Sequence, residues 1–294
     1  MISDNGTSTA KEVDEIAGLY IVENPALEHL LFDRNLMGIE FRRACAESSR
    51  LMVGHLLDEL DPDVTELVIL GKGLAYQLAS AFDSYGLNLP TNLLATSRKD
   101  VEGDSASVVV SYRSLDAAGD SIIIGDTVAS GATVVTALNE YRKVHEVRRL
   151  HLLSFAGAVG GARVILDYCR RHAIQAKLLY GLAAFGLAKN GFDLSFLHPD
   201  TLTKDAYRQR AAEQFNSKPV SAVGWDFGSQ YMAPDKYRAL SWVEAEIWGL
   251  RGHESLAIAS RPRSFSVVSK ESDAFAGMAE YLRDPSELPP SDQP

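Results

Sequence analysis

The chain has 294 residues, of which 46% are hydrophobic and 23% are charged, as in an ordinary globular protein with a sizeable core. Its 29 basic and 39 acidic residues give a net charge of −10, which argues against a nucleic-acid-binding surface. No apolar run reaches the roughly 20 residues that span a bilayer, and the polar first 15 residues lack the apolar core of a secretory signal. We therefore expect a cytoplasmic protein, whose two cysteines, Cys45 and Cys169, are buried thiols.

The first half of the chain predicts alternating helices and strands. Residues 1–18 are expected to form a flexible leader, and a helical spacing of apolar residues fills 38–60. Further elements follow in order: a buried strand over 65–70, a helix that ends near Gly86, a strand over 91–97, a polar mobile excursion over 98–107 and a strand over 108–112.

The second half continues the alternation. An apolar strand runs into Asp126, and after a loop of small residues a helical pattern begins at once. Three more elements come next: a strand near 147–155, a helix near 160–172 and a strand near 176–183. This order predicts an α/β fold in which a mostly parallel twisted sheet is flanked by helices. Ligands of such sheets bind at the carboxyl ends of the strands, where Gly71–Gly73, the loop after Asp126 and the segment after Ala183 all lie.

We expect the main domain to cover residues 19–238, with an insertion at about 199–223 that is rich in polar and charged residues. Residues 239–294 form a C-terminal extension in this interpretation. It begins with a helical apolar pattern over 239–248 and ends in a proline-rich, disordered tail.

The loop after Asp126 has the composition of an anion site. A strand, a tight turn and a helix start place unpaired backbone N–H groups and the positive helix end together. The loop residues concerned are Ala129, Ser130, Gly131, Ala132 and Thr133. Asp126 can accept hydrogen bonds from sugar hydroxyls beside such an anion, so the segment suits a ribose 5-phosphate. The structural alternative is a close-packed strand–turn–helix connection in which Asp126 caps its own loop.

The same segment resembles the loop that binds phosphoribosyl pyrophosphate (PRPP) in type I phosphoribosyltransferases. That pattern has four apolar residues, two acids, an apolar and a variable residue, and then Ala-Thr-Gly-Gly-Thr. The matching residues are Asp126, Ala129, Ser130, Gly131 and Thr133, with serine in place of threonine. Gly125 stands at the first acid position and is the main departure.

Other segments between about residues 20 and 230 resemble the uracil phosphoribosyltransferase branch of this family. They are Asn24–His29, Glu40–Arg42, Ile69–Leu74, Ser97–Asp100, Gly186–Phe192 and Gly224–Gly228. Gly71 replaces an arginine of the branch and Ser195 a proline, and the insertion separates two elements that are nearly contiguous there.

The resemblance implies magnesium-dependent transfer of the phosphoribosyl group from PRPP to a nitrogen of a uracil-like base, with release of pyrophosphate. In this interpretation Lys72 and Gly73 receive the pyrophosphate, Arg98 closes over it, and Asp226 faces the magnesium ion through water or the pyrophosphate. Gly191, Phe192 and Leu194 would bind the base. A homodimer is expected.

Simpler interpretations stay open for several of these residues. Lys72 and Arg98 are also compatible with a solvated surface, and Phe192 with a core position. The alternatives for the whole chain are the same transfer to a different acceptor in specialised metabolism and a non-catalytic sensor of PRPP or nucleotides that regulates a partner. The missing acid at Gly125 and the long C-terminal extension are compatible with the sensor. The sequence shows no complete dinucleotide-binding glycine motif, no histidine ligand spacing and no nucleophile elbow.

Overall fold

An eight-stranded sheet forms the centre of the computed structural model, which describes residues 8–33, 36, 38–101, 104–187, 194–215, 217 and 222. In spatial order its strands are β1 (Thr9–Glu12), β2 (Leu19–Glu23), β9 (Gln175–Gly181), β7 (Arg149–Ser154), β6 (Ser121–Gly125), β3 (Thr65–Ile69), β4 (Thr91–Val101) and β5 (Asp104–Ser114). The six inner strands run parallel, and β1 and β5 pair antiparallel at the two edges. The predicted α/β class and mostly parallel sheet are confirmed.

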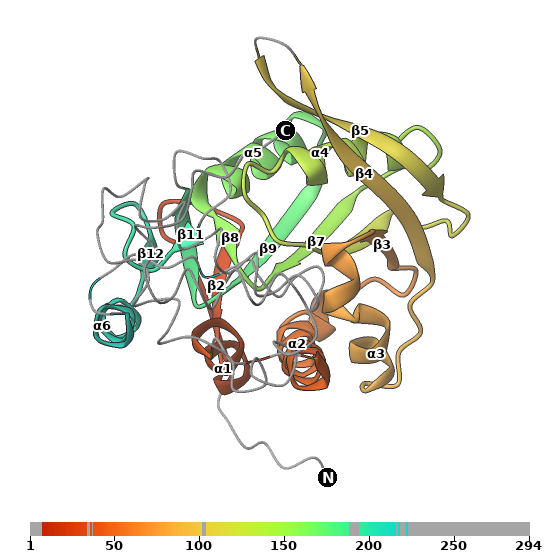
Figure 1. Ribbon diagram of the computed structural model, residues 1–294. Coiled ribbons are helices and arrows are strands. Elements are labelled where there is room, and N and C mark those ends of the chain that lie inside the picture. Colours follow the sequence, from red (N-terminus) through yellow and green to blue (C-terminus); the bar gives the residue numbers. More distant parts are fainter. Residues whose placement is uncertain are drawn as a thin grey trace, which may run out of the picture.

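Helices cover both faces of the sheet (Figure 1). One face carries α1 (Pro25–Phe32), α2 (Gly38–Gly54), the 3-10 helix η2 (Lys72–Tyr76) and α3 (Leu78–Asp83), and the other carries α4 (Ala132–Tyr141) and α5 (Val159–Arg171). A further 3-10 helix, η1 (Leu57–Glu59), follows α2. Along β6, Ile123 joins the first core, whereas Ile122 and Ile124 join the second. Because both faces of this strand are buried, its sequence is a continuous apolar run.

A small second sheet contains β8 (Gly157–Ala158), β10 (Ala183–Leu187), β11 (Leu194–Ser195) and β12 (Leu202–Thr203), and α6 (Asp205–Gln214) follows it. Residues 202–214 of the predicted insertion are thus a strand and a helix. Tyr207 of α6 lies beside Phe32 of α1, with ring centroids 6.0 Å apart, and donates a hydrogen bond of 2.9 Å to Glu28. Residues 202–214 therefore pack onto the domain through α1.

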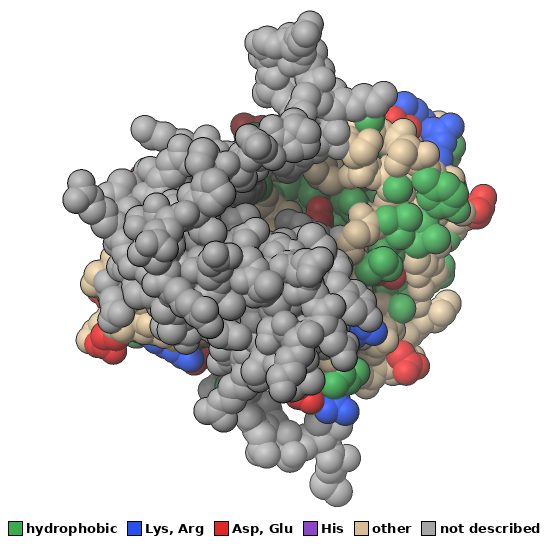
Figure 2. Space-filling model, viewed as in Figure 1, with side chains coloured by type: hydrophobic (Ala, Val, Ile, Leu, Met, Phe, Trp, Pro, Cys, Tyr) green, Lys and Arg blue, Asp and Glu red, His purple; other side chains and the backbone are tan. Residues whose placement is uncertain are grey.

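The predicted excursion over 98–107 is wrong for the described residues, because β4 reaches Val101, β5 begins at Asp104 and the two strands pair antiparallel as a long hairpin. Register pairs such as Arg98 with Val108 extend the ladder beyond the length that the sequence indicates. The hairpin projects away from the helix layers (Figure 1). Figure 2 shows hydrophobic side chains gathered over the hairpin region, where Tyr112 is exposed.

Two further local differences have simple causes. β1 lies within the predicted leader, and its four residues are all exposed, so an edge strand here carries no apolar signal. The helix predicted before Gly86 is divided at Gln77, which adopts a left-handed conformation with φ 48°. The division into domains stays a prediction, since most of residues 216–294 lie outside the described residues.

Both cysteines are buried thiols, as predicted. Within the described part of the chain, no helix has the length and apolar character needed to cross a membrane.

Candidate functional site

A cavity of about 380 Å³ lies where β3 and β6 end, beside the middle of β4. Eleven residues line it: Ile69, Leu70, Thr96, Asp126, Thr127, Val128, Ala129, Ser130, Gly131, Thr133 and Val134. From β3 the chain moves to β4 on one side, and from β6 it moves to β7 on the other. The cavity therefore lies at the point where the strand order reverses, which is the usual ligand position in open α/β sheets.

The predicted anion loop forms one wall of this cavity. Gly131 precedes α4 in a left-handed conformation with φ 81°, and the helix begins at Ala132. The first-turn N–H groups of a helix have no intrahelical acceptors and carry its positive dipole end. The hydroxyl of Ser130 accepts one of them, from Ala132, at 3.4 Å. Among the predicted phosphate ligands, Ala129, Ser130, Gly131 and Thr133 line the cavity, while Ala132 is exposed at the helix start.

Close backbone packing holds this loop in place. A Cβ atom on Gly131 would lie 2.8 Å from the carbonyl oxygen of Gly161 in α5. In turn, a Cβ on Gly161 would lie 2.3 Å from the carbonyl oxygen of Ala129. The N–H of Ala158 also donates to the carbonyl of Val128 at 2.7 Å. The loop is thus preorganised by α5 and β8 and needs little rearrangement to bind an anion.

Asp126 follows β6 directly and lines the same cavity, although only 6% of it is exposed. Its Oδ1 accepts the N–H of Thr127 at 2.8 Å, and its own N–H donates to Leu153 at 3.1 Å. The first of these bonds caps the loop after Asp126. It is the bond expected if this segment is only a close-packed strand–turn–helix connection. Since a carboxylate accepts several hydrogen bonds at once, capping is compatible with binding a sugar hydroxyl.

The presence of glycine and not an acid at residue 125 has a steric cause that the sequence does not reveal. A Cβ there would lie 2.5 Å from Cγ of Tyr76, a distance that real contacts do not reach. The Tyr76 ring is fully buried and stacks on Phe155 at 4.0 Å. Burial, and next the negative charge of Asp126, raise the pKa of Tyr76 far above that of an ordinary phenol. An acidic side chain cannot stand at residue 125 while this tyrosine occupies the space.

The predicted pyrophosphate loop adjoins the same strand end. Gly71 has φ 99°, a conformation that favours glycine. A Cβ on Gly73 would lie 3.2 Å from the carbonyl oxygen of Gly125. Lys72 is the first residue of η2, and Leu70 just before this loop lines the cavity. The backbone at Gly73 therefore lies close to the end of β6, directly before Asp126.

The remaining predicted site residues are not brought together by the described part of the structure. Arg98 belongs to β4, where only its backbone is described. Leu194 is buried in β11, its carbonyl accepts the N–H of Ala222, and it is not among the residues that line the cavity. Gly191, Phe192 and Asp226 lie outside the described residues.

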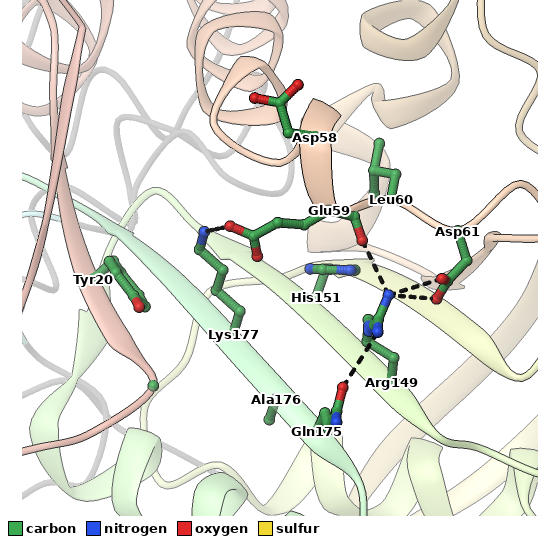
Figure 3. A pocket seen from close by; sticks show the side chains of 11 residues that line it. Tyr20, Asp58, Glu59, Leu60, Asp61, Arg149, His151, Gln175, Ala176 and Lys177 are labelled. Carbon is green, nitrogen blue, oxygen red and sulfur yellow. Dashed lines mark hydrogen bonds and ion pairs between the residues drawn. The ribbon is translucent and has the colours of Figure 1, made fainter.

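A second cavity, of about 500 Å³, opens at the opposite edge, where β7 and β9 begin (Figure 3). Its two cations, Lys177 and Arg149, form ion pairs of 2.5 Å with Glu59 and 2.8 Å with Asp61. Burial, and next the charge of Arg149, lower the pKa of His151 to about 4, so this side chain is neutral near pH 7. With its cations already compensated, this cavity suits a polyanion less than the first.

No protein-family model matches the chain, and no curated protein matches its sequence. Solved structures with a similar arrangement include "AQ2163 protein" from Aquifex aeolicus, at 16% identity and a TM-score of 0.46, covering 58% of this chain and 95% of that one. Adenine phosphoribosyltransferase from Leishmania donovani has 14% identity and a TM-score of 0.42, with 59% and 86% covered. A phosphoribosyltransferase from Corynebacterium diphtheriae has 19% identity and a TM-score of 0.34, with 53% and 95% covered. Likenesses this distant do not assign an activity to this chain.

Proposed function

We propose that the protein is a phosphoribosyltransferase, which transfers the 5-phosphoribosyl group from PRPP to a nitrogen of a small planar base and releases pyrophosphate. One observation carries this proposal. A single cavity at the reversal point of the sheet combines the N-terminal loop of α4 with the carboxylate of Asp126. An anion cradle beside an acceptor of sugar hydroxyls is complementary to a ribose 5-phosphate.

The proposed reaction breaks the bond between the ribose anomeric carbon and pyrophosphate, and the base nitrogen then forms a bond to that carbon as its proton passes to the released pyrophosphate or to water. The ribose becomes positively charged as pyrophosphate leaves with the bonding electron pair. Asp126 would bind a ribose hydroxyl and stabilise this charge, while the loop from Ala129 to Thr133 holds the 5-phosphate. Positioning and electrostatic stabilisation account for most of the catalysis in such a site.

The pyrophosphate end of the substrate belongs to the loop at Gly71–Gly73. In this proposal Lys72 and the backbone at Gly73 bind the leaving group, and Arg98 on the hairpin closes over it and excludes water. The close approach of Gly73 to Gly125 supports a single site that is shared by the two loops.

Magnesium is the metal ion implied by a pyrophosphate leaving group. The described residues contain no group of three or more His, Cys, Asp or Glu side chains that could hold a metal. Mg²⁺ usually binds through one or two carboxylates together with substrate phosphates, so one carboxylate, Asp126, fits an ion that arrives with PRPP. Asp226 is proposed as a further group that faces this ion through water or the pyrophosphate.

The acceptor is proposed to be uracil or a uracil-like ring, on the resemblance of Gly186–Phe192 to the base-binding segment of that branch. Gly191, Phe192 and Leu194 remain the proposed base-binding residues. The buried side chain of Leu194 restricts its part to the backbone.

A second function is favoured by the close packing of Tyr76 on Gly125, which leaves the end of β6 without a second acid next to Asp126. A protein with this loop could bind PRPP as a regulatory sensor without turning it over. The two functions share the phosphate cradle and differ in whether pyrophosphate is released.

The test is pyrophosphate release from magnesium-PRPP with a panel of pyrimidine and purine bases, next to a direct measurement of PRPP binding. Release that depends on one base supports the transferase and identifies its acceptor. PRPP binding without release by any base supports the sensor, and absence of binding contradicts both.

A further inference from the structure

Tyr76 connects the two halves of the proposed site without lining the cavity. It is the last residue of η2, the short helix that starts at Lys72. On Gly125, just before Asp126, an ideal Cβ would lie 2.5 Å from Cγ and 2.6 Å from Cβ of Tyr76. Even a methyl group at residue 125 would therefore overlap both the ring and its attachment point.

The other side of the ring is fixed as well. Tyr76 stacks on Phe155 with ring centroids 4.0 Å apart and an angle of 10° between the planes. Its Oη accepts the N–H of Phe155 at 2.9 Å. Phe155 follows β7 directly, so the tyrosine is clamped between the ends of β6 and β7. Because the ring is packed on both sides, a displacement of η2 also displaces Gly125 and the residue that follows it, Asp126.

We propose that Tyr76 is a positioning residue, which sets the carboxylate of Asp126 relative to the loop at Gly71–Gly73. The proposal rests on the proposed function, because these two segments are the ribose side and the pyrophosphate side of that site. The same contact makes glycine obligatory at residue 125, so that the ribose is served by a single acidic side chain at this strand end. The ring is fully buried, and it therefore acts on the reaction through Asp126.

The test compares Tyr76→Phe and Tyr76→Leu in the full chain, with kcat and the KM for PRPP measured separately. The ring alone carries the steric contact, so we expect Tyr76→Phe, which loses only the hydroxyl and its hydrogen bonds, to retain kcat within about fivefold. Tyr76→Leu removes the ring that packs on Gly125. Displacement of a reacting group by about 1 Å lowers the reaction rate by up to about 100-fold. We therefore expect kcat to fall at least tenfold, on the order expected from such misplacement, with a smaller change in KM. Equal loss in Tyr76→Phe and Tyr76→Leu, or an unchanged kcat in folded Tyr76→Leu, overturns the proposal.

A second variant approaches the contact from the other side. Gly125→Ala places a methyl group against the ring, and we expect it to lower kcat as Tyr76→Leu does. Gly160→Ala is its matched control, since a Cβ on Gly160 meets nothing within 4 Å. Normal kcat in Gly125→Ala contradicts the positioning role. If the wild type does not bind PRPP, the proposed function is contradicted instead. The difference in unfolding midpoint between Gly125→Ala and Gly160→Ala still tests the steric contact between residue 125 and Tyr76, because it needs no ligand.

Discussion

The conformation of Gly131 leads to the sharpest prediction about the anion loop. Gly131→Ala puts a side chain on a residue with φ 81° and brings its Cβ to 2.8 Å from the carbonyl oxygen of Gly161. The left-handed backbone costs alanine about 1–2 kcal/mol, and the overlap adds about 1–3 kcal/mol. We therefore expect the free energy of unfolding to fall by about 2–5 kcal/mol. Because the loop must shift to relieve the overlap, affinity for PRPP should fall as well.

Urea unfolding followed by circular dichroism measures the first effect, and titration with magnesium-PRPP measures the second. Gly160→Ala, in the first turn of α5, is the control. Nothing lies within 4 Å of its added Cβ, so it should leave stability unchanged or raise it by about 0.5–1 kcal/mol. If Gly131→Ala unfolds at the same urea concentration as Gly160→Ala and binds PRPP as the wild type does, the loop is not held as described.

Two buried ionisable groups predict how stability changes with pH. Burial raises the pKa of Glu66 from 4.5 to about 7, so the folded protein loses stability as pH rises from about 4.5 to 7. Above pH 7, Glu66→Gln should be more stable than the wild type by up to about 3 kcal/mol. Below pH 4.5 the two proteins should have similar stability. Unfolding midpoints of the two proteins that stay equal across this range would refute the burial argument. His151 behaves in the opposite sense, because burial lowers its pKa from 6.5 to about 4 and stability is lost as pH falls through that window. His151→Leu should remove up to about 3 kcal/mol of this loss of stability at low pH. If the unfolding midpoint of His151→Leu depends on pH as that of the wild type does, His151 is not the group responsible.

The central part of the fold could be predicted because its signals are local. The strand that ends at Asp126 is buried on both faces, and the turn after it contains a glycine with a required left-handed conformation. Apolar runs and small residues report such features without any knowledge of distant contacts. The α/β class and the position of the cavity followed from them.

Two of the elements that were missed, β1 and the distal part of the β4–β5 hairpin, lack a local signal, whereas the apolar run of β2 had one and was overlooked. The sequences of β1 and of the distal hairpin are polar, and the strands are recognised only by their backbone pairing. The contact of Tyr76 with Gly125 joins residues that are far apart in the sequence, and nothing near either residue indicates it. For this reason the missing acid at residue 125 could be noticed from the sequence, but its steric cause required the structure.

The most direct test of the account is the kcat of Asp126→Asn for pyrophosphate release from saturating magnesium-PRPP with the accepted base. The amide keeps the size of the side chain but removes the charge that would stabilise the developing positive charge on the ribose. We expect kcat to fall by about 100-fold or more, while Asp83→Asn, the same change at an exposed residue of α3, leaves it unchanged. Turnover by Asp126→Asn at the wild-type rate would contradict the assignment of this cavity as the site of phosphoribosyl transfer.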